Sequence, residues 1–189
     1  YGATKLCSDK LFISGNAYSS HDNCKFAVVR YGNVMGSRGS VIPFFLNQRN
    51  DNVLTITDTT MTRFMITLEQ GVELVWHAFD DMVGGEIYVK KIPSMNIMEI
   101  ANAISKSAEK KIVGIRPGEE LHEQMVCPED APYTLEYEDY FKILPAINDW
   151  YKCDVRRYGG KPVPADFCYT SDNNKEWMEI SKLQEMIEK

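Results

Sequence analysis

The feature that most constrains the fold is an alternation of short apolar runs with segments of helical period over the first 92 residues. The short apolar run at 26–31 is consistent with a buried parallel strand, and residues 86–89 are expected to form another strand. Residues 1–18 and 68–82 place apolar side chains three or four positions apart, as amphipathic helices do. Strands that alternate with helices are typical of a parallel sheet covered by helices. The sequence therefore predicts an α/β fold.

Beyond residue 92 the expected elements are mixed. We expect a helix that Ser94 caps and that runs to about Lys106, then a short helix or turn at 121–126. The alternation over 133–144 predicts one half-buried strand, and 180–189 is expected to be a terminal helix. The sequence thus predicts two unequal parts.

Composition excludes several classes of function. The 189 residues carry a net charge of −6 without a cluster of lysines and arginines, which disfavours nucleic acid as a partner. The five cysteines form no Cys-x-x-Cys pair and the three histidines are scattered, so we expect no metal site. This cysteine usage suits a reducing cytoplasm. No apolar run approaches ~20 residues, so we expect no membrane span in this segment.

The chain opens on Tyr1-Gly2-Ala3-Thr4-Lys5, a Tyr-x-x-x-Lys pair. On a helix, positions four apart share one face. A lysine beside a tyrosine favours the phenolate and lowers the pKa of the phenol. Such a tyrosine can accept the proton of an alcohol while a hydride leaves the same carbon. An ordinary helix face is the alternative interpretation of the pair taken alone.

A loop rich in Gly, Ser and Asn follows the apolar run at 26–31. In open α/β sheets, ligands bind at the carboxyl ends of strands, which is where residues 32–41 are expected to lie. Asn33 follows the strand end and can both donate and accept hydrogen bonds. A turn residue is the alternative for Asn33. Strand alternation places Arg30 on the face opposite to that of Tyr31, and we expect Arg30 to be a structural ion-pair partner.

Five blocks in one order resemble a known family. They are Tyr-Gly-Ala-Thr-Lys-Leu-Cys-Ser-Asp-Lys (1–10), Val-Val-Arg-Tyr-Gly-Asn-Val-Met-Gly-Ser-Arg-Gly-Ser-Val-Ile-Pro-Phe-Phe (28–45), Thr-Asp-Thr-Thr-Met-Thr-Arg-Phe (57–64), Gly-Gly-Glu-Ile-Tyr-Val-Lys-Lys-Ile-Pro-Ser-Met (84–95) and Ile-Arg-Pro-Gly-Glu-Glu-Leu-His-Glu (115–123). In this order the chain resembles the extended short-chain dehydrogenases/reductases. More narrowly, it is similar to the inverting UDP-N-acetylglucosamine 4,6-dehydratases of polysaccharide biosynthesis, which begin pseudaminic acid synthesis.

The resemblance implies a division of labour along the chain. Residues 1–35 and 64–92 would be the remainder of an NADP-binding Rossmann domain, and residues 36–63 and 93–189 a smaller substrate domain. The Gly-rich half that holds the pyrophosphate is expected upstream of Tyr1, together with the elimination acid and base. We therefore expect the chain to be the C-terminal portion of a longer enzyme and to be inactive as a dehydratase by itself.

The resemblance also implies the redox site. Tyr1 would accept the proton of the sugar C4 hydroxyl, and Lys5 would hold the nicotinamide ribose. Val34 would lie against the cofactor, which is expected to be NADP, with NAD as the alternative. Asn33 would contact the nucleotide sugar, UDP-N-acetylglucosamine.

The remaining expected contacts belong to the nucleotide. Val41, Pro43 and Phe45 would line the uridine pocket, although helix packing explains Phe45 equally well. Arg63 and Arg116 would grip the diphosphate, because guanidinium groups match its oxygens with paired hydrogen bonds. A surface arginine is the alternative for each of them.

Two further groups of residues receive structural interpretations. Glu119, Glu120, His122 and Glu123 are expected to form a solvated or substrate-facing acidic helix rather than a metal site. Tyr169 and Trp177 are expected to anchor the C-terminal tail.

The expected activity is NADP-dependent dehydration of the UDP-sugar, a lyase reaction, by a cytoplasmic homo-oligomer. A UDP-sugar 4-epimerase or 4-reductase of the same superfamily would share Tyr1, Lys5 and Asn33. A non-catalytic nucleotide-sugar-binding remnant is the alternative outside enzymes.

Overall fold

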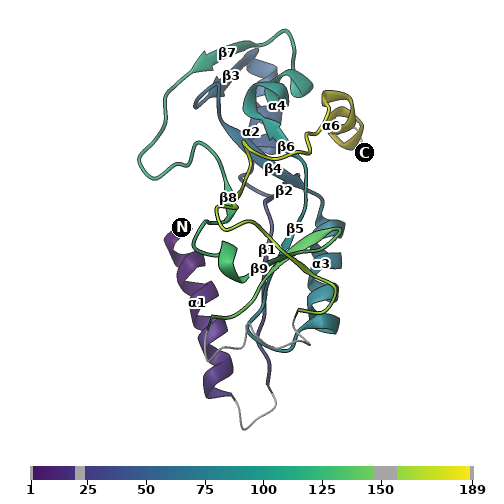
Figure 1. Cartoon of the computed structure of the whole chain (residues 1–189). Helices are drawn as coiled ribbons and strands as arrows, with labels where there is room; N and C mark the ends of the chain where they lie inside the picture. Colours follow the sequence, from purple (N-terminus) through teal and green to yellow (C-terminus); the bar gives the residue numbers. More distant parts are fainter. Residues whose placement is uncertain (1, 20–23, 147–156, 188–189) are drawn as a thin grey trace. The chain divides into compact units, whose positions relative to one another are not determined.

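The structure, a computed structural model, describes residues 2–19, 24–146 and 157–187, and the chain divides into two compact units (Figure 1). Unit one contains Tyr1–Arg30, Glu69–Lys91 and Met125–Cys168, and unit two contains Tyr31–Leu68, Ile92–Gln124 and Tyr169–Lys189. Each unit has its own sheet and its own core.

Unit one is built on a five-stranded sheet in the order β1-β5-β10-β9-β11. Its elements are α1 (Gly2–Tyr18), β1 (Val28–Arg30), α3 (Leu68–Asp81), β5 (Ile87–Lys90), a 3₁₀ turn (Ala131–Tyr133), β9 (Thr134–Glu136), β10 (Tyr140–Ile143) and β11 (Lys161–Pro162). Strands β1 and β5 are parallel, and β10 runs antiparallel to β5 and β9. In Figure 1, α1 and α3 lie on either side of β1 and β5. The predicted α/β fold class is confirmed.

Helix α3 has the predicted length but turns an unexpected face inward. The apolar stripe is exposed at Val72 and Phe79 and half-buried at Met82, and Trp76 is exposed at 65% of its surface. The buried positions are instead Leu74 and Ala78, together with Gly71. Small residues on this face bring the helix close to Tyr88 of β5, which is fully buried. Spacing alone located the helix and not its buried side.

Residues 133–144 do not form the single strand that their alternation predicted. They form the two strands of a hairpin, β9 and β10, in which Phe141 lies opposite Glu136. The chain reverses between Tyr137 and Tyr140, where the amide of Tyr137 donates to the carbonyl oxygen of Tyr140 at 2.9 Å. The polar pair at 138–139 occupies the turn, which is where such residues are favoured.

The described residues of unit two include two small sheets and three helices whose side chains share one core. Its elements are β2 (Asn33–Val34), α2 (Val41–Gln48), a 3₁₀ turn (Arg49–Asp51), β3 (Val53–Ile56), β4 (Thr62–Ile66), β6 (Ser94–Asn96), α4 (Ile97–Ile104), β7 (Glu109–Ile112), β12 (Tyr169–Thr170) and α6 (Ile180–Ile187). One sheet has the order β2-β4-β6, and the other pairs β3 with β7 in parallel. The core includes Phe45, Met95, Ile100 and Leu183, from α2, β6, α4 and α6.

Two expectations for unit two are wrong. Helix α4 is capped by Asn96, whose side chain accepts from the amide of Met98, and Ser94 lies in β6 instead. Ser94 is fully buried and its amide bonds the carbonyl of Glu176, which fixes it in extended backbone. The segment 121–126 is not a helix. It ends in strand β8 (Gln124–Val126), whose first residue is assigned to unit two and whose other residues are assigned to unit one.

Strand β4 has no counterpart among the expected elements. Its first residues, Thr62 and Arg63, are polar, so the run around them reads as a loop. The strand is nonetheless the centre of its sheet, and it makes Gly32 necessary. A Cβ at Gly32 would lie 2.5 Å from the Cβ of Phe64, closer than two such atoms can approach. The glycine therefore allows the chain that enters β2 to pass against β4.

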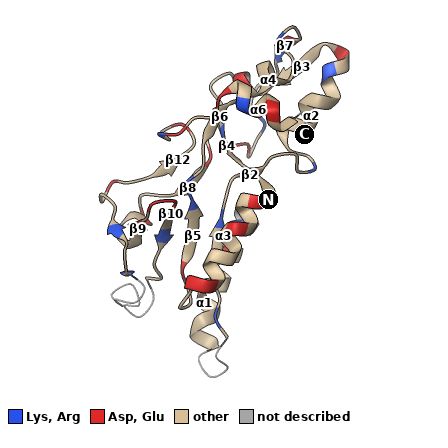
Figure 2. Cartoon of the chain, turned by 90° about the vertical axis from the view of Figure 1, so that its right-hand side faces the viewer, with Lys and Arg blue, Asp and Glu red and all other residues tan. Residues whose placement is uncertain are grey.

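The expected division of domains stays a prediction, and the compact units have other boundaries: residues 31–35 and 64–68 lie in unit two. Residues 125–168 belong to unit one with the sheet, whereas residues 36–63 and 93–124 belong to unit two. Lysines and arginines are spread over many elements of both units (Figure 2). Within the described ranges, no helix is both long and apolar enough to cross a membrane.

Candidate functional site

A cavity of about 330 Å³ in unit two gathers most of the expected nucleotide contacts. The lining includes Asn33, Val41, Phe45, Arg63 and Arg116. These residues come from β2, α2, β4 and the segment after β7, so folding brings together positions that are up to 83 apart in the sequence (116 − 33). Five of the residues expected to touch substrate therefore share one surface.

The N-terminus of α2 forms one wall of this cavity. Gly39, Ser40 and Val41 line it. Ser40 is the N-cap, but its side chain makes no capping bond, and its buried Oγ has no partner among the described residues. Pro43, three positions on, has no N–H, which removes one of the two amides that an N-cap side chain can bond. The first amides of the helix, with the positive end of its dipole, make this wall suitable for an anion.

Arg116 is displayed by a tight turn. The amide of Glu119 donates to the carbonyl oxygen of Arg116 at 3.0 Å, with Pro117 and Gly118 at the two central positions. Gly118 has a φ of 81°, which the second central residue of a type II turn requires. The side chain of Arg116 is exposed, and no hydrogen bond to its guanidinium is found within the described residues. This guanidinium is the cation of the cavity that can meet an anionic ligand.

Arg63 is engaged differently. Its Nη1 donates to the carbonyl oxygens of Thr62 at 2.7 Å and Leu121 at 3.1 Å, and its Nη2 donates to that of Glu120 at 2.9 Å. Three of its five N–H groups are thus used to tie the segment at 120–121 to β4. Arg63 lines the cavity, but its hydrogen bonds hold the cavity wall in place. Its role is therefore mainly structural.

Asn33 and Glu123 form a pair at the cavity's edge. The Nδ2 of Asn33 donates to Oε1 of Glu123 at 2.8 Å, and the amide of Phe64 donates to Oε2 at 2.6 Å. Burial raises the pKa of the Glu123 carboxyl above its ordinary value, against the opposing effect of the Phe64 amide and the Arg63 charge. The expected acidic helix at 119–123 is absent, because the segment is a turn followed by extended chain.

The apolar residues expected around uridine have different places. Phe45 is 1% exposed and belongs to the core of unit two, so packing accounts for most of its surface. Val41 lies at the first position of α2 and lines the cavity. Pro43 and Val34 are partly buried and are not part of the lining.

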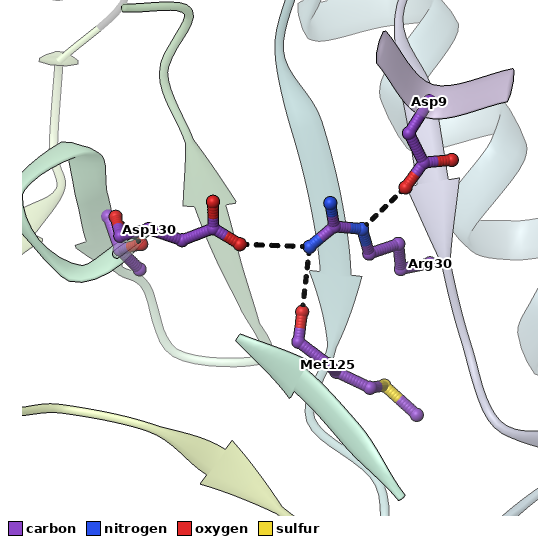
Figure 3. A network of polar contacts seen from close by, with 5 residues as sticks. Asp9, Arg30, Met125 and Asp130 are labelled. Carbon is purple, nitrogen blue, oxygen red and sulfur yellow. Dashed lines mark hydrogen bonds and ion pairs between the residues drawn. The ribbon is translucent and has the colours of Figure 1, made fainter. Parts of the chain in front are cut away.

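Of the expected redox pair, Tyr1 and Lys5, the structure describes only Lys5. Tyr1 lies outside the described residues, and Lys5 is an exposed residue of α1 in unit one. The helix that carries Lys5 is held by Arg30, whose Nε donates to Oδ2 of Asp9 at 2.8 Å. Figure 3 shows the rest of this network: Nη1 of the same guanidinium reaches Asp130 at 3.1 Å and the carbonyl oxygen of Met125 at 3.0 Å. The structural role expected for Arg30 is confirmed.

Sequence reasoning missed Ser40, Thr57 and Glu119 as lining residues. Oε1 of Glu119 lies 3.4 Å from Oγ1 of Thr57, and Oε2 accepts from the amide of Arg116 at 3.2 Å. The missing N–H of Pro43 was a local signal that could have drawn attention to Ser40. The described residues contain no group of three side chains arranged as metal ligands.

The expected anchoring of the tail is confirmed. The hydroxyl of Tyr169 donates to the carbonyl oxygen of Ile92 at 2.9 Å and accepts from its amide at 3.0 Å. Trp177 pairs with Ser94 through an isolated β-bridge, and its Nε1 donates to the carbonyl oxygen of Asn174. These contacts fix the tail within unit two.

A sequence model of the family described as polysaccharide biosynthesis protein matches residues 1–145. The chain belongs to this family. It is 47% identical over 195 residues to the UDP-N-acetylglucosamine 4,6-dehydratase (inverting) of Campylobacter jejuni subsp. jejuni serotype O:2, a match that covers 99% of this chain and 58% of that protein. It is 35% identical to a UDP-glucose 4-epimerase of Rickettsia conorii, over 98% of this chain and 56% of that protein.

Among solved structures, Pen from Bacillus thuringiensis has a TM-score of 0.82 with this polysaccharide biosynthesis family member at 31% identity. The match covers 99% of this chain and 56% of that one. The chain therefore spans somewhat more than half the length of these relatives. The resemblance that the five sequence blocks indicated is confirmed.

Proposed function

We propose that this chain carries the nucleotide-sugar site and the Tyr-x-x-x-Lys helix of an enzyme that dehydrates UDP-N-acetylglucosamine to a 4-keto-6-deoxy sugar with inversion at C5. The observation that carries the proposal is the cavity of unit two, in which the exposed Arg116 and the N-terminus of α2 line one hollow. Both features favour an anion. The 47% identity to a protein named for this activity supports the choice of reaction.

In the proposed site the diphosphate lies between Arg116 and the first amides of α2. Ser40 adds a hydroxyl whose oxygen has no partner in the described structure. Val41 offers apolar surface to the uracil ring, Phe45 supports the cavity wall from the core, and Asn33 faces the sugar. Arg63 acts mainly by fixing the carbonyl groups at 120–121, and so the wall that carries Arg116.

The redox step is assigned to α1. Tyr1 would accept the proton of the C4 hydroxyl, and Lys5 would favour the phenolate and bond the ribose of the cofactor. The residues present fit a nicotinamide cofactor, because Lys5 is exposed on a helix that the Asp9–Arg30 ion pair holds. A nicotinamide cofactor bound there would supply the hydride acceptor for C4 and the hydride donor for C6. Val34 is proposed to lie against this cofactor, for which NAD is the alternative.

The setting is also proposed. A UDP-sugar made for polysaccharide synthesis suits a cytoplasmic enzyme, and we propose a homo-oligomer.

The alternative reaction is 4-epimerisation, which the 35% identity to a UDP-glucose 4-epimerase supports. Mass spectrometry of the product separates the two, since dehydration removes one water from the sugar and epimerisation leaves its mass unchanged.

The nucleotide site can be tested on this chain by isothermal titration with UDP. A bidentate bond to a charged group contributes about 1.5–3 kcal/mol, so Arg116→Ala should weaken UDP binding about ten- to a hundredfold. Arg116→Lys should restore only part of the affinity, since an ammonium is a point charge. Arg49→Ala is the matched control, because Arg49 is an exposed arginine of unit two outside this cavity.

Equal dissociation constants for the wild type and Arg116→Ala would return Arg116 to the role of a surface arginine.

The redox assignment needs a separate test in an active enzyme that contains this chain. There, Tyr1→Phe should abolish oxidation at C4 and leave UDP-sugar binding unchanged. A variant that retained more than about a tenth of the activity would exclude Tyr1 as the base.

A further inference from the structure

We infer that Glu123 is a positioning residue that decides which polar group Asn33 presents to the ligand, so that Asn33 accepts a hydrogen bond from a hydroxyl or N–H of the sugar. This inference rests on the proposed function, because it takes the cavity of unit two as a nucleotide-sugar site. It adds a determinant of specificity: the pair should favour a nucleotide that carries a sugar over the same nucleotide without one.

The orientation of the Asn33 amide follows from the chemistry of its partner. An ionised carboxylate has only acceptors, whereas an amide has a donor end and an acceptor end. Oε1 of Glu123 receives Nδ2 of Asn33 at 2.8 Å, and Oε2 receives the amide of Phe64 at 2.6 Å. The amide group of Asn33 must therefore turn its nitrogen toward Glu123 and its oxygen away.

Glu123 is itself held from several directions. Its amide donates to Oγ of Ser171 at 2.9 Å, and its carbonyl oxygen accepts from the amide of Ser171 at 2.8 Å. Ser171 is fully buried, and its hydroxyl lies 2.7 Å from that of Thr62, a residue of β4. The backbone of Glu123 is thus joined through Ser171 to Thr62 in the central strand of the sheet. Its side chain is bonded to the amide of Phe64 in the same strand. A carboxylate fixed in this way can impose its orientation on an exposed partner.

Asn33 is that exposed partner. It lies at the first position of β2, it lines the cavity, and its Oδ1 has no partner in the described parts of the chain. A fully ionised diphosphate offers no donor to this oxygen, whereas sugar hydroxyls and the acetamido N–H do. The outward oxygen of Asn33 therefore suits the sugar end of the ligand.

Two substitutions reverse and then restore this polarity. In Glu123→Gln, the Phe64 amide still requires an acceptor, so the new side chain must turn its oxygen there and its nitrogen toward Asn33. Asn33 then has to invert and present its nitrogen to the cavity. In the double variant Glu123→Gln with Asn33→Asp, the aspartate accepts from the glutamine and again presents an oxygen. The double variant also keeps the net charge of the pair.

The experiment measures the dissociation constants of UDP-N-acetylglucosamine and of UDP for the three proteins. Loss of one neutral hydrogen bond corresponds to about a fivefold change, so the preference for the sugar nucleotide should fall about fivefold in Glu123→Gln. The double variant should regain the wild-type preference. An unchanged preference in Glu123→Gln, or a preference that the double variant fails to restore, would overturn the inference.

A measurement without ligand separates this inference from the proposed function. If the wild type binds neither nucleotide, the proposed function fails, and the side-chain amide resonance of Asn33 in the free chain still reports the pair. We expect its proton shift to follow the ionisation of Glu123 in the wild type and to lose that pH dependence in Glu123→Gln. Arg63 and Glu120, the charged groups that act on Glu123, remain in that variant. A shift that follows pH equally in both proteins contradicts the pairing.

Discussion

The Nε of Arg30 donates to Oδ2 of Asp9 at 2.8 Å, which joins the last residue of β1 to the middle of α1. Asp9 lies four residues after Lys5, and positions four apart share a helix face. The same guanidinium bonds Asp130 and the carbonyl oxygen of Met125. One side chain therefore holds the helix of the proposed redox pair and the segment at 125–130 to the sheet (Figure 3).

Arg30→Met should be strongly destabilising. It keeps much of the side chain's volume but leaves the carboxylates of Asp9 and Asp130, which are only 18% and 15% exposed, without their cation. Removing one partner of a largely buried ion pair costs about 3 kcal/mol, and urea unfolding should show a loss of that order. Lys91→Met is the matched control, since its partner Glu136 is 50% exposed and such pairs contribute less than about 1 kcal/mol. Similar losses in both variants would mean that the Arg30 network adds nothing beyond a surface pair.

Gly32→Ala should destabilise unit two although it adds a single methyl group. The new Cβ would lie 2.5 Å from the Cβ of Phe64 and 3.1 Å from its carbonyl oxygen, and neither atom belongs to a flexible chain end. Overpacking of this kind costs about 1–3 kcal/mol. Thermal unfolding should show a lower Tm, and proton exchange of the β4 amides should become faster. Wild-type stability in this variant would show that β2 and β4 are not in close contact.

The elements that the sequence predicted best are those whose signal is local. Helices α1 and α6 follow from the spacing of apolar residues within a few turns. Strand β4 was missed because its polar start resembles a loop, and its position depends on pairing with β2 and β6. The cap of α4 was misassigned because Ser94 and Asn96 are both good caps. The choice between them was made by the partner of Ser94 at residue 176, far along the chain.

The candidate site divides in the same way. Motifs identified Asn33 and Arg116, and the cavity of unit two contains both. They could not show that Arg63 donates to backbone carbonyls, because two of the three carbonyls lie 57 and 58 positions away. Nor could they single out Glu123 among its acidic neighbours. Its role depends on Asn33, which is 90 positions distant.

The raised pKa of Glu123 gives a pH dependence with a definite sign. Burial raises the pKa of this carboxyl in the folded chain above the value near 4.5 that it has when unfolded. Between these two values the folded state binds more protons than the unfolded state, so this group lowers the free energy of unfolding as the pH rises through that window. Above the folded pKa its effect is constant. Glu123→Gln should remove this part of the slope.

The measurement is urea unfolding of the wild type and Glu123→Gln across the acidic range. The difference between the two curves isolates Glu123 from Asp58 and Asp172, whose pKa values are lowered by their hydrogen bonds to Thr60 and Thr170 and whose effect on stability has the opposite sign. A difference that is independent of pH, or that grows in favour of the wild type with rising pH, contradicts the assignment.

Arg63 and Arg116 should separate when stability and ligand binding are measured together. Arg63→Lys loses a fork that serves three carbonyl groups, and a lysine cannot reach all three with the same geometry. We expect it to lower the free energy of unfolding by about 1–3 kcal/mol, since a hydrogen bond from a charged group to a carbonyl oxygen contributes that much. UDP binding should weaken as a consequence, because the segment that carries Arg116 loses its anchor.

Arg116→Ala should show the opposite pattern. Its guanidinium is exposed, and its turn is held by backbone bonds and by Glu119, so the free energy of unfolding should change by less than about 0.5 kcal/mol while UDP binding weakens sharply. Urea unfolding gives the free energy of unfolding of Arg63→Lys and Arg116→Ala, and calorimetric titration of the same preparations gives their dissociation constants for UDP. If Arg116→Ala were the destabilised variant and Arg63→Lys the one defective only in binding, the two arginines would have exchanged roles. The diphosphate would then have to be placed against β4 rather than against the turn at 116–119.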